Sequence, residues 1–279
     1  VHPYINEIHP TLVFASELKT LSNCINKLRV DEKEISSYIR NGFFYHEKTP
    51  FQDVYEVSPG TILTVTINGL SIQKNSFFDI LDYYKKDKIN DFESALRLVD
   101  ESLHKSVKDR LLSSDLEVGA FLSGGIDSSL IVAIASSYVD ELKTFTVKFN
   151  GTFDESKLAK LTAKKYQTDH KEILISMNLK DDIETILCNY GEPFMDSSAI
   201  PSYYVSQEAK KYVTVVLNGD GADELFGGYR RYVPVANNWI GIAKYLSNFA
   251  NLLPKTNNKQ SNLNYIYRLL KLSKKKGLD

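Results

Sequence analysis

A short segment near the middle of the chain constrains the fold more than any other feature. It covers residues 118–130 and reads VGAFLSGGIDSSL. The apolar start predicts a buried strand, the two adjacent glycines a sharp turn, and the apolar residues that follow a helix. A helix start supplies unpaired backbone N–H groups and the positive end of the helix dipole, which together favour an anion. The segment lacks the Gly-Lys-Ser/Thr of a P-loop and the spacing of a dinucleotide-binding turn.

Asp127 narrows the kind of anion that this loop can bind. A carboxylate in the first helical turn suits the helix dipole but repels a phosphate. Magnesium relieves that conflict, because Mg²⁺ is held by one or two carboxylates together with phosphate oxygens. The segment thus predicts a site for a magnesium-bound phosphate chain, against the plainer alternative of an ordinary strand–helix turn. A serine hydrolase is rejected, since no Gly-x-Ser-x-Gly elbow surrounds Ser123.

The chain around this loop alternates between short apolar strands and helices. The expected strands cover residues 117–122, 144–149, 171–175 and 213–217. The expected helices cover residues 128–138, 155–167, 179–190 and 198–211. This alternation predicts an α/β fold with a doubly wound parallel sheet, in which ligands bind beyond the carboxyl ends of the strands.

The first part of the chain has a different pattern. Residues 61–67 alternate as a strand does, Asn68-Gly69 is a strong hairpin signal, and residues 70–74 form the return strand. Asp31 has the spacing of a helix cap, leading into a helix that ends near Gly42. We therefore expect an α+β region with antiparallel pairing.

A polar stretch over residues 81–90 separates this region from a long amphipathic helix capped by Asp91. The helix has one apolar face, formed by Phe92, Ala95, Leu96, Val99, Leu103, Val107 and Leu111. We place a domain boundary near residue 85, with one domain over residues 1–85 and another over 86–279. Residues 235–279 are expected to be largely helical, and the lysine run at 274–276 to be a solvated end.

A second motif follows the expected strand at residues 213–217. It covers residues 218–229 and reads NGDGADELFGGY. Asp220, Asp223 and Glu224 would repel one another unless they are solvated, protonated or bound to a cation. A solvated acidic loop is the ordinary interpretation of such a run. Here the run follows a strand of the same expected sheet, where a magnesium pyrophosphate site would need it.

These motifs resemble a known family. Ser123–Ser129 is similar to the pyrophosphate-binding loop of the N-type ATP pyrophosphatases, and residues 218–229 resemble the second signature of the glutamine-hydrolysing asparagine synthetases. Residues 192–201 (EPFMDSSAIP) and 14–19 (FASELK) are similar to that family as well. The resemblance covers nearly the whole chain. It implies a glutaminase-type remnant over residues 1–85 and an ATP-binding synthetase domain over residues 86–279.

The resemblance implies ATP-dependent amidation of aspartate through β-aspartyl-AMP, with ATP and Mg²⁺ as cofactors and glutamine as the source of ammonia. Asp127 and Asp220 would be catalytic, and Asp127 and Asp223 would bind the metal. Asp220 stands where some members carry a glutamate that acts as a base toward ammonia. The nucleotide-binding set would be Phe121, Leu122, Ser123, Gly124, Gly125, Asp127, Ser128, Ser129, Val147, Asn218 and Gly219. Val147 is equally consistent with a core residue, and Asp154 and Glu155 with a simple helix start.

The chain also departs from the family pattern. Members begin with a catalytic cysteine, whereas this chain begins with Val1, and Cys24 lies in a different context. Their lysine motif that neutralises the transition-state phosphate is not matched by residues 274–276. Arg230 and Arg231 are the nearest basic candidates but suit ordinary surface roles. We therefore expect an internal fragment that does not hydrolyse glutamine by itself.

Composition excludes several other classes. The formal charge of −1, from 34 basic and 35 acidic residues, gives no sign of nucleic-acid or membrane-surface binding. The longest apolar run, at 130–135, is too short for a bilayer, and no signal peptide is recognised. The two cysteines cannot form a disulfide framework, so we expect the protein in the reducing cytoplasm. No role is assigned to His2, His9, His46, His104 or His170.

Three alternatives remain open. A relative with the same loop could amidate another carboxylate, as β-lactam synthetases or enzymes that modify peptides or sugars do. A tRNA-modifying relative is less consistent with the balanced charge and the distant cysteines. The chain could instead be a non-catalytic ATP-binding or assembly module, with dimerisation through the N-terminal region.

Overall fold

A computed structural model describes residues 4–6, 11–25, 27–66, 71–148, 156–174, 179–253 and 261–273. The chain forms two compact units, Val1–Leu217 and Asn218–Asp279. The boundary near residue 85 expected from the sequence lies inside the first unit and stays a prediction.

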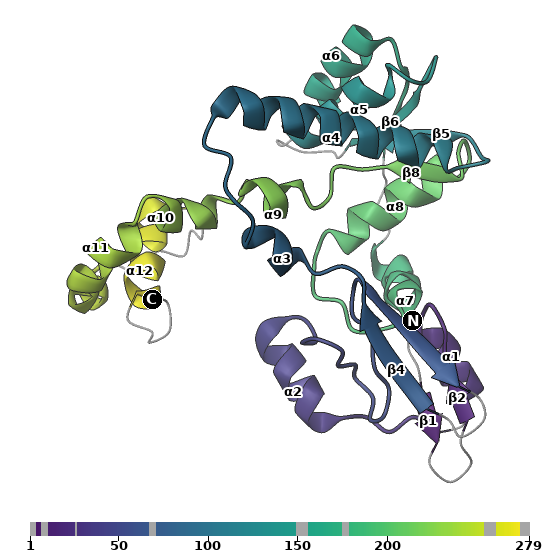
Figure 1. The fold of residues 1–279 in the computed structure, drawn as a ribbon, viewed down its shortest axis with the longest axis vertical. Coiled ribbons are helices and arrows are strands. Elements are labelled where there is room, and N and C mark those ends of the chain that lie inside the picture. Colours follow the sequence, from purple (N-terminus) through teal and green to yellow (C-terminus); the bar gives the residue numbers. More distant parts are fainter. Residues whose placement is uncertain are drawn as a thin grey trace. The chain divides into compact units, whose positions relative to one another are not determined.

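The first unit contains a four-stranded sheet with helices packed beside it (Figure 1). Its strands are β5 (Val118–Phe121), β6 (Lys143–Lys148), β7 (Asp169–Leu174) and β8 (Val215–Leu217). Their order is β7-β6-β5-β8, and every neighbouring pair is parallel. The chain steps outward from β5 to β7 and then returns to add β8 on the other side of β5. The expected parallel sheet is confirmed, and its strand order reverses between β5 and β8.

Helices cover both faces of this sheet, as a doubly wound fold requires. One face packs against α4 (Phe92–Leu112), α5 (Ile126–Ala135) and α6 (Ser156–Tyr166), and the other against α7 (Leu179–Tyr190) and α8 (Ala199–Ala209). The first core contains Val107, Ala120, Leu122, Val132 and Ala159. The second contains Phe145, Ile173, Ile186, Tyr204 and Val213. Burial of these apolar side chains fixes the sheet and thus the ends of its strands.

The cap of helix α4 and part of its predicted apolar face are found in the structure. Asp91 caps it as expected, because its carboxylate accepts a hydrogen bond from the Ser94 N–H at 2.8 Å. Of the predicted apolar face, Leu103, Val107 and Leu111 join the core. Phe92 and Leu96, nearer the helix start, are exposed.

The N-terminal region has the expected α+β character. Its elements are β1 (Tyr4–Asn6), β2 (Thr11–Val13), α1 (Leu18–Cys24), α2 (Glu32–Asn41), β3 (Thr61–Thr66) and β4 (Ser71–Ser76). β3 and β4 pair antiparallel, which confirms the hairpin, while its Asn68-Gly69 turn lies outside the described residues. Asp31 caps α2, and Gly42 ends it with a φ of 85°, a left-handed conformation that favours glycine.

The stretch expected to be a polar connection contains a short helix, α3 (Ile80–Tyr84). Its cap is Asp79, whose carboxylate accepts a hydrogen bond from the Leu81 N–H at 2.9 Å. The polar residues 81–90 gave no sign of this helix, because its cap, Asp79, precedes them.

The second unit is helical over its described residues. This confirms the expectation for residues 235–279, whereas the helical turns before residue 235 were not expected. It contains α9 (Ala222–Phe226), η1 (Arg230–Tyr232), α10 (Val233–Ala236), α11 (Trp239–Leu246), η2 (Ser247–Leu252) and α12 (Asn262–Leu272). A small core of Ala243, Ala250 and Leu270 joins its later helices. None of the helices among the described residues of the chain is long and apolar enough to cross a membrane.

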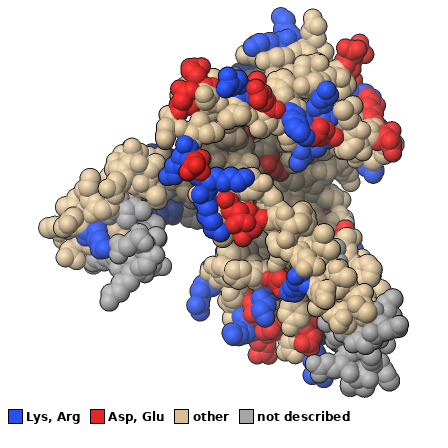
Figure 2. Space-filling view, in the orientation of Figure 1, with Lys and Arg blue, Asp and Glu red and all other residues tan. Residues whose placement is uncertain are grey.

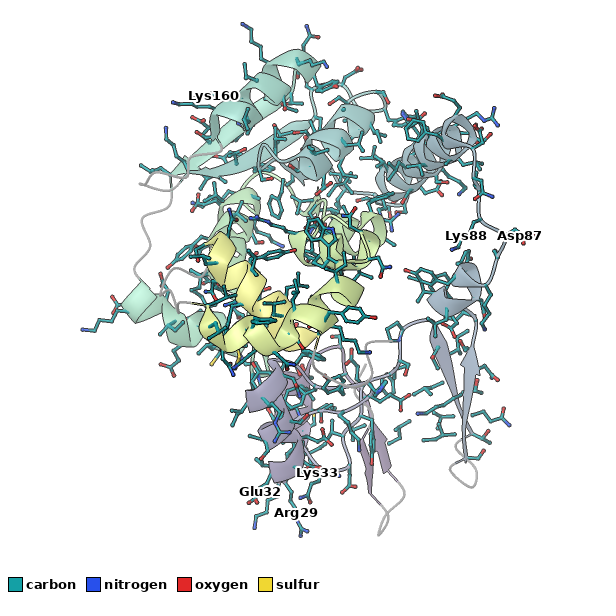
Figure 3. All side chains as sticks on the ribbon, turned by 90° about the vertical axis from the view of Figure 1, so that its left-hand side faces the viewer. Arg29, Glu32, Lys33, Asp87, Lys88 and Lys160 are labelled. Carbon is teal, nitrogen blue, oxygen red and sulfur yellow. The ribbon has the colours of Figure 1, made fainter. Side chains whose placement is uncertain are left out.

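The face of β6 toward α6 is polar at two buried positions. The Thr144 hydroxyl lies 2.9 Å from His170 Nδ1 and 2.8 Å from the Thr168 hydroxyl. Burial lowers the pKa of His170, and the nearby carboxylate of Glu172 partly offsets this by raising it. Glu172 in turn pairs with Lys160 at 2.7 Å. Figure 3 shows Lys160 on α6. Two buried atoms of this group, His170 Nε2 and Glu172 Oε1, have no hydrogen-bond partner among the described residues.

Loss of the Phe145 side chain, the largest of those less than 2% exposed among the described residues, should destabilise the fold strongly. Phe145 is 1% exposed, and Phe145→Ala should cost about 3–5 kcal/mol of unfolding free energy through the cavity that it leaves. Phe77 is 71% exposed, so Phe77→Ala should change stability by less than about 0.5 kcal/mol. Urea denaturation followed by circular dichroism measures both, and equal shifts of the two midpoints would contradict this core.

His170 should make stability depend on pH. Its pKa is lower in the folded protein than in the unfolded chain, so the unfolded chain binds the proton first as pH falls below about 6.5. Stability is therefore lost on acidification through that window. Urea denaturation between about pH 7 and 5.5 should show a steeper loss for the wild type than for His170→Gln. Parallel pH profiles would show that His170 does not contribute.

Candidate functional site

The loop Ser123–Gly125 joins β5 to α5 at the carboxyl edge of the sheet. β5 pairs with β6 on one side and with β8 on the other, so the loop leaves the sheet where the strand order reverses. In doubly wound sheets this switch point is where ligands bind. The chain leaves β8 at the same edge, since β5 and β8 are parallel, and continues directly into the second motif.

The Ser128 hydroxyl holds the loop together from inside. Its oxygen accepts a hydrogen bond from the Ser123 N–H at 3.2 Å and lies 2.9 Å from the Ser123 hydroxyl. It also donates to the Gly125 carbonyl at 3.3 Å. Ser128 is 8% exposed. The loop therefore has a defined shape before any ligand binds, and the Ser128 side chain contributes mainly to that shape.

The helix start leaves backbone donors available. The first N–H groups of a helix have no carbonyl in a preceding turn to which they can donate. At α5 the cap residue is Gly125, which has no side chain that could accept a hydrogen bond in their place. Gly124 has a φ of 85°, the conformation that lets the chain turn there. Asp127 is exposed in the first turn of α5. An anion with a bound cation suits this combination.

Ser129, the next residue of the motif, lies against a neighbouring helix. Its hydroxyl is 3.3 Å from the Thr162 hydroxyl of α6. The side chain of Ser129 is half-buried, and the contact ties the start of α5 to α6.

The expected nucleoside-pocket residues divide between the two faces of the sheet. Phe121 and Val147 pack against the same cluster, beside Phe145. The Leu122 side chain belongs to the core on the opposite face and is 1% exposed. Phe121 and Val147 thus lie on the same face of the sheet. Leu122 contributes only its backbone to the loop, because its side chain is buried in the core on the other face.

The second motif has its own local order. The Asn218 side-chain amide donates to Asp220 Oδ2 at 2.8 Å, and Gly219 lies between them. Gly221 has a φ of 89° and caps α9, whose first turn carries Asp223 and Glu224. The Tyr229 hydroxyl donates to Glu224 at 2.5 Å. Asp223 is half-buried, whereas Asp220 is exposed.

The segment at residues 192–201 contacts the N-terminal region. Burial raises the pKa of Glu192, and the nearby Glu56 carboxylate raises it further. The Ser198 N–H, which donates to the Asp196 carboxylate at 2.9 Å, lowers the pKa of Asp196. The rings of Tyr190 and Phe194 stack with centroids 4.2 Å apart.

Among the other basic candidates from the sequence, Arg230 has side-chain contacts that the structure describes. Arg230 donates to Asn262 at 3.3 Å and lies over the Tyr265 ring, which is a packing role within the second unit. Asp154, Glu155 and residues 274–276 lie outside the described residues, and the side chain of Arg231 is not described. Cys24 and Cys188 are both exposed free thiols.

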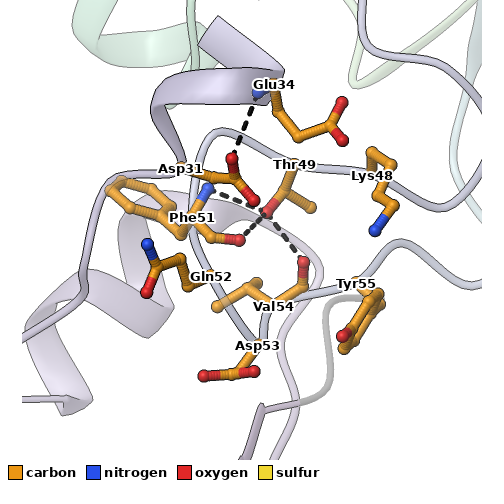
Figure 4. Close-up of a pocket in the computed structure, with 9 residues that line it drawn as sticks. All are labelled: Asp31, Glu34, Lys48, Thr49, Phe51, Gln52, Asp53, Val54 and Tyr55. Carbon is orange, nitrogen blue, oxygen red and sulfur yellow. Dashed lines mark hydrogen bonds between the residues drawn. The ribbon is translucent and has the colours of Figure 1, made fainter.

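A separate pocket lies in the N-terminal region (Figure 4). It is lined by Asp31, Glu34, Lys48, Thr49, Phe51, Gln52, Asp53, Val54 and Tyr55. Its polar groups already serve the local fold, since Asp31 caps α2 and the Thr49 hydroxyl donates to the Val54 carbonyl at 2.8 Å. Figure 2 shows Lys and Arg interspersed with Asp and Glu on the face in view, in line with the balanced charge.

Sequence reasoning missed Thr146 and Thr162. Thr146 donates from its hydroxyl to the Leu122 carbonyl, at the point where the loop begins. Its signal was present, because Thr144 and Thr146 stand on either side of Phe145 in the strand, and buried hydroxyls must find partners. Thr162 gave no such signal, since its meeting with Ser129 depends on how two helices pack.

Comparison with known proteins gives the family. The sequence pattern of the family described as Asparagine synthase matches residues 98–276. "Asparagine synthetase [glutamine-hydrolyzing] 1" of Bacillus subtilis is 34% identical over 263 residues, which cover 90% of this chain and 40% of that protein. "Asparagine synthetase [glutamine-hydrolyzing] 3" of the same organism is 29% identical, over 78% of this chain and 38% of that protein. The chain thus spans about two fifths of the length of these relatives.

Among solved structures, the chain is similar to a glutamine-dependent NAD⁺ synthetase of Acinetobacter baumannii in complex with ADP. The match covers 65% of this chain and 34% of that one, with a TM-score of 0.37 and 17% sequence identity.

The matched family pattern includes both the loop after β5 and the motif after β8, and it extends over more than half of the chain. On this evidence, the chain belongs to the asparagine synthase family.

Proposed function

We propose that this chain carries the ATP-cleaving part of a glutamine-hydrolysing asparagine synthetase, a carbon–nitrogen ligase. The main support is the ordered strand–loop–helix at the switch point, where backbone donors and Asp127 meet the requirements of a magnesium-bound pyrophosphate. The relatives named above carry the same activity in their names.

In the proposed reaction, the side-chain carboxylate of aspartate attacks the α-phosphate of ATP. The bond between the α- and β-phosphates breaks, which releases pyrophosphate and leaves β-aspartyl-AMP. Ammonia then attacks the acyl carbon, loses a proton and displaces AMP, giving asparagine. The first turn of α5 and the Ser123 hydroxyl bind the pyrophosphate portion, and Phe121 and Val147 line the nucleoside side. Catalysis rests on positioning and on stabilising developing charge.

The carboxylates fit magnesium as a partner of the nucleotide. No cluster of three or more potential metal ligands exists among the described residues, so no closed protein cage is present there. Magnesium commonly binds through one or two carboxylates plus phosphate oxygens, and Asp127 and Asp223 are proposed to hold it. When bound, the ion would neutralise charge on the phosphates.

Asp220 is proposed to take the proton from ammonia. Its Oδ2 accepts the Asn218 amide, which fixes the orientation of the carboxylate and leaves Oδ1 for a proton. The ammonia would come from glutamine hydrolysed elsewhere in the assembled enzyme. We place this small-molecule chemistry in the cytoplasm, without nucleic-acid or membrane partners, and expect a homodimer as one arrangement.

Product analysis tests the function. ATP, Mg²⁺, ammonium and aspartate should yield AMP, pyrophosphate and asparagine in equal amounts. Formation of ADP would contradict the proposed cleavage, and AMP formed with another carboxylic acid would replace aspartate as the acceptor.

The Asp127 carboxylate should be needed for magnesium nucleotide binding. Asp127→Asn should weaken Mg–ATP binding by about tenfold or more, because it removes a charged ligand. Asp115→Asn is a matched control, since Asp115 is exposed just before the amino end of the same strand, β5. Isothermal titration calorimetry should show wild-type affinity for the control. Equal affinities of the two variants would refute the role of Asp127.

The Asp223 carboxylate should keep its position only if residue 228 has no side chain. A Cβ at Gly228 would lie 2.0 Å from Asp223 Oδ1, so Gly228→Ala must displace that carboxylate. Magnesium affinity in the presence of ATP should fall by about 10–100-fold. Gly241→Ala is the control, because a Cβ there meets its nearest neighbour at 3.4 Å. A magnesium titration that does not distinguish the two variants would exclude this arrangement.

A further inference from the structure

The start of the phosphate loop depends on one peptide group, which joins Leu122 to Ser123. β5 ends at Phe121, and the last ladder pair between β5 and β6 is Phe121 with Phe145. Leu122 is the first residue beyond the strand. Its N–H still donates to the Phe145 carbonyl at 2.9 Å. The orientation of the next peptide group therefore decides in which direction the loop leaves the sheet.

Two hydroxyl groups hold that peptide group from opposite ends. The Leu122 carbonyl accepts a hydrogen bond from the Thr146 hydroxyl of β6. The Ser123 N–H, on the other side of the same planar unit, donates to the Ser128 hydroxyl at 3.2 Å. Rotating the peptide plane would break both bonds at once.

The surroundings make both bonds important. Thr146 is 2% exposed and Leu122 is 1% exposed, so water cannot replace the hydroxyl at the carbonyl. Loss of the hydroxyl would leave a buried carbonyl without a partner, and the peptide group would gain by turning toward solvent. That turn would pull Ser123 away from Ser128 and from Gly125, whose N–H donates to the Ser123 hydroxyl at 3.3 Å.

We infer that Thr146 is a positioning residue for the phosphate loop, acting through the Leu122–Ser123 peptide group that it shares with Ser128. It touches neither the nucleotide nor the metal. Its contribution is to order the loop before binding, so that less ordering has to be done when the phosphates arrive. The inference rests on the proposed nucleotide site, but the order of the free loop can be measured separately.

The test uses two substitutions that remove a hydroxyl from the same face of β6. Thr146→Val keeps the shape of the side chain and removes its bond to Leu122. Thr144→Val is the matched control, since Thr144 is equally buried but bonds to His170 and Thr168 instead of the loop. Thr146→Ser keeps the hydroxyl and should restore wild-type behaviour.

Hydrogen exchange of the Ser123 amide in the absence of nucleotide is the first measurement. Exchange should become about tenfold faster in Thr146→Val, and stay as in the wild type in Thr144→Val and Thr146→Ser. The KM for ATP should rise about tenfold in Thr146→Val alone, with a smaller change in kcat.

The outcomes separate the two proposals. Unchanged exchange at Ser123 in Thr146→Val, or equal acceleration in Thr144→Val, would overturn the positioning role even if the wild type binds Mg–ATP. If the wild type binds no Mg–ATP, the proposed function fails, and the exchange data still decide whether Thr146 orders the loop.

Discussion

The start of helix α5 at the end of strand β5 is the feature on which the rest of this account depends. A helix start exposes backbone N–H groups, and a strand end fixed by neighbours on both sides gives those groups a constant position. The sheet supplies that constancy, because both of its faces are buried under helices. The shape of the loop thus follows from the packing of the sheet core, to which most residues of the loop do not belong.

The loop is held mainly by hydroxyl groups. Ser128 bonds inside the loop, Ser129 meets Thr162 of α6, and Thr146 reaches the loop from the neighbouring strand. Hydroxyls suit this task, since each can donate and accept, and since they leave the site without a fixed charge. The nearby charge comes from Asp127, which is exposed and which we propose as a ligand of the cation.

Much of the fold could be predicted from the sequence. The alternation of strands and helices, the cap at Asp91 and the loop after β5 were all visible in local patterns, and each is found in the structure. The cap at Asp79 was missed, because α3 is only five residues long and lies beside a polar run. The exposure of Phe92 and Leu96 on the apolar face of α4 was not predicted either, since periodicity shows which residues share a face but not what packs against them.

Local patterns located the candidate loop but not the contacts of its side chains. Motif spacing singled out the loop after β5 as the candidate phosphate site, a role that stays a prediction, and it gave Ser128 and Ser129 the same role. In the structure Ser128 is enclosed by the loop and Ser129 faces α6. Leu122 was expected to line a pocket, but its side chain belongs to the core, and the alternation along the strand end places it on the opposite face from Phe121. These differences depend on contacts between elements distant in sequence, which no local pattern contains.

Titration of magnesium pyrophosphate into the isotopically labelled chain, followed by backbone amide resonances, tests the central claim most directly. We expect the largest changes at Ser123–Ser129, with little change around the N-terminal pocket at residues 31–55. Binding with unchanged resonances at Ser123–Ser129 would contradict the account, as would changes confined to the N-terminal pocket.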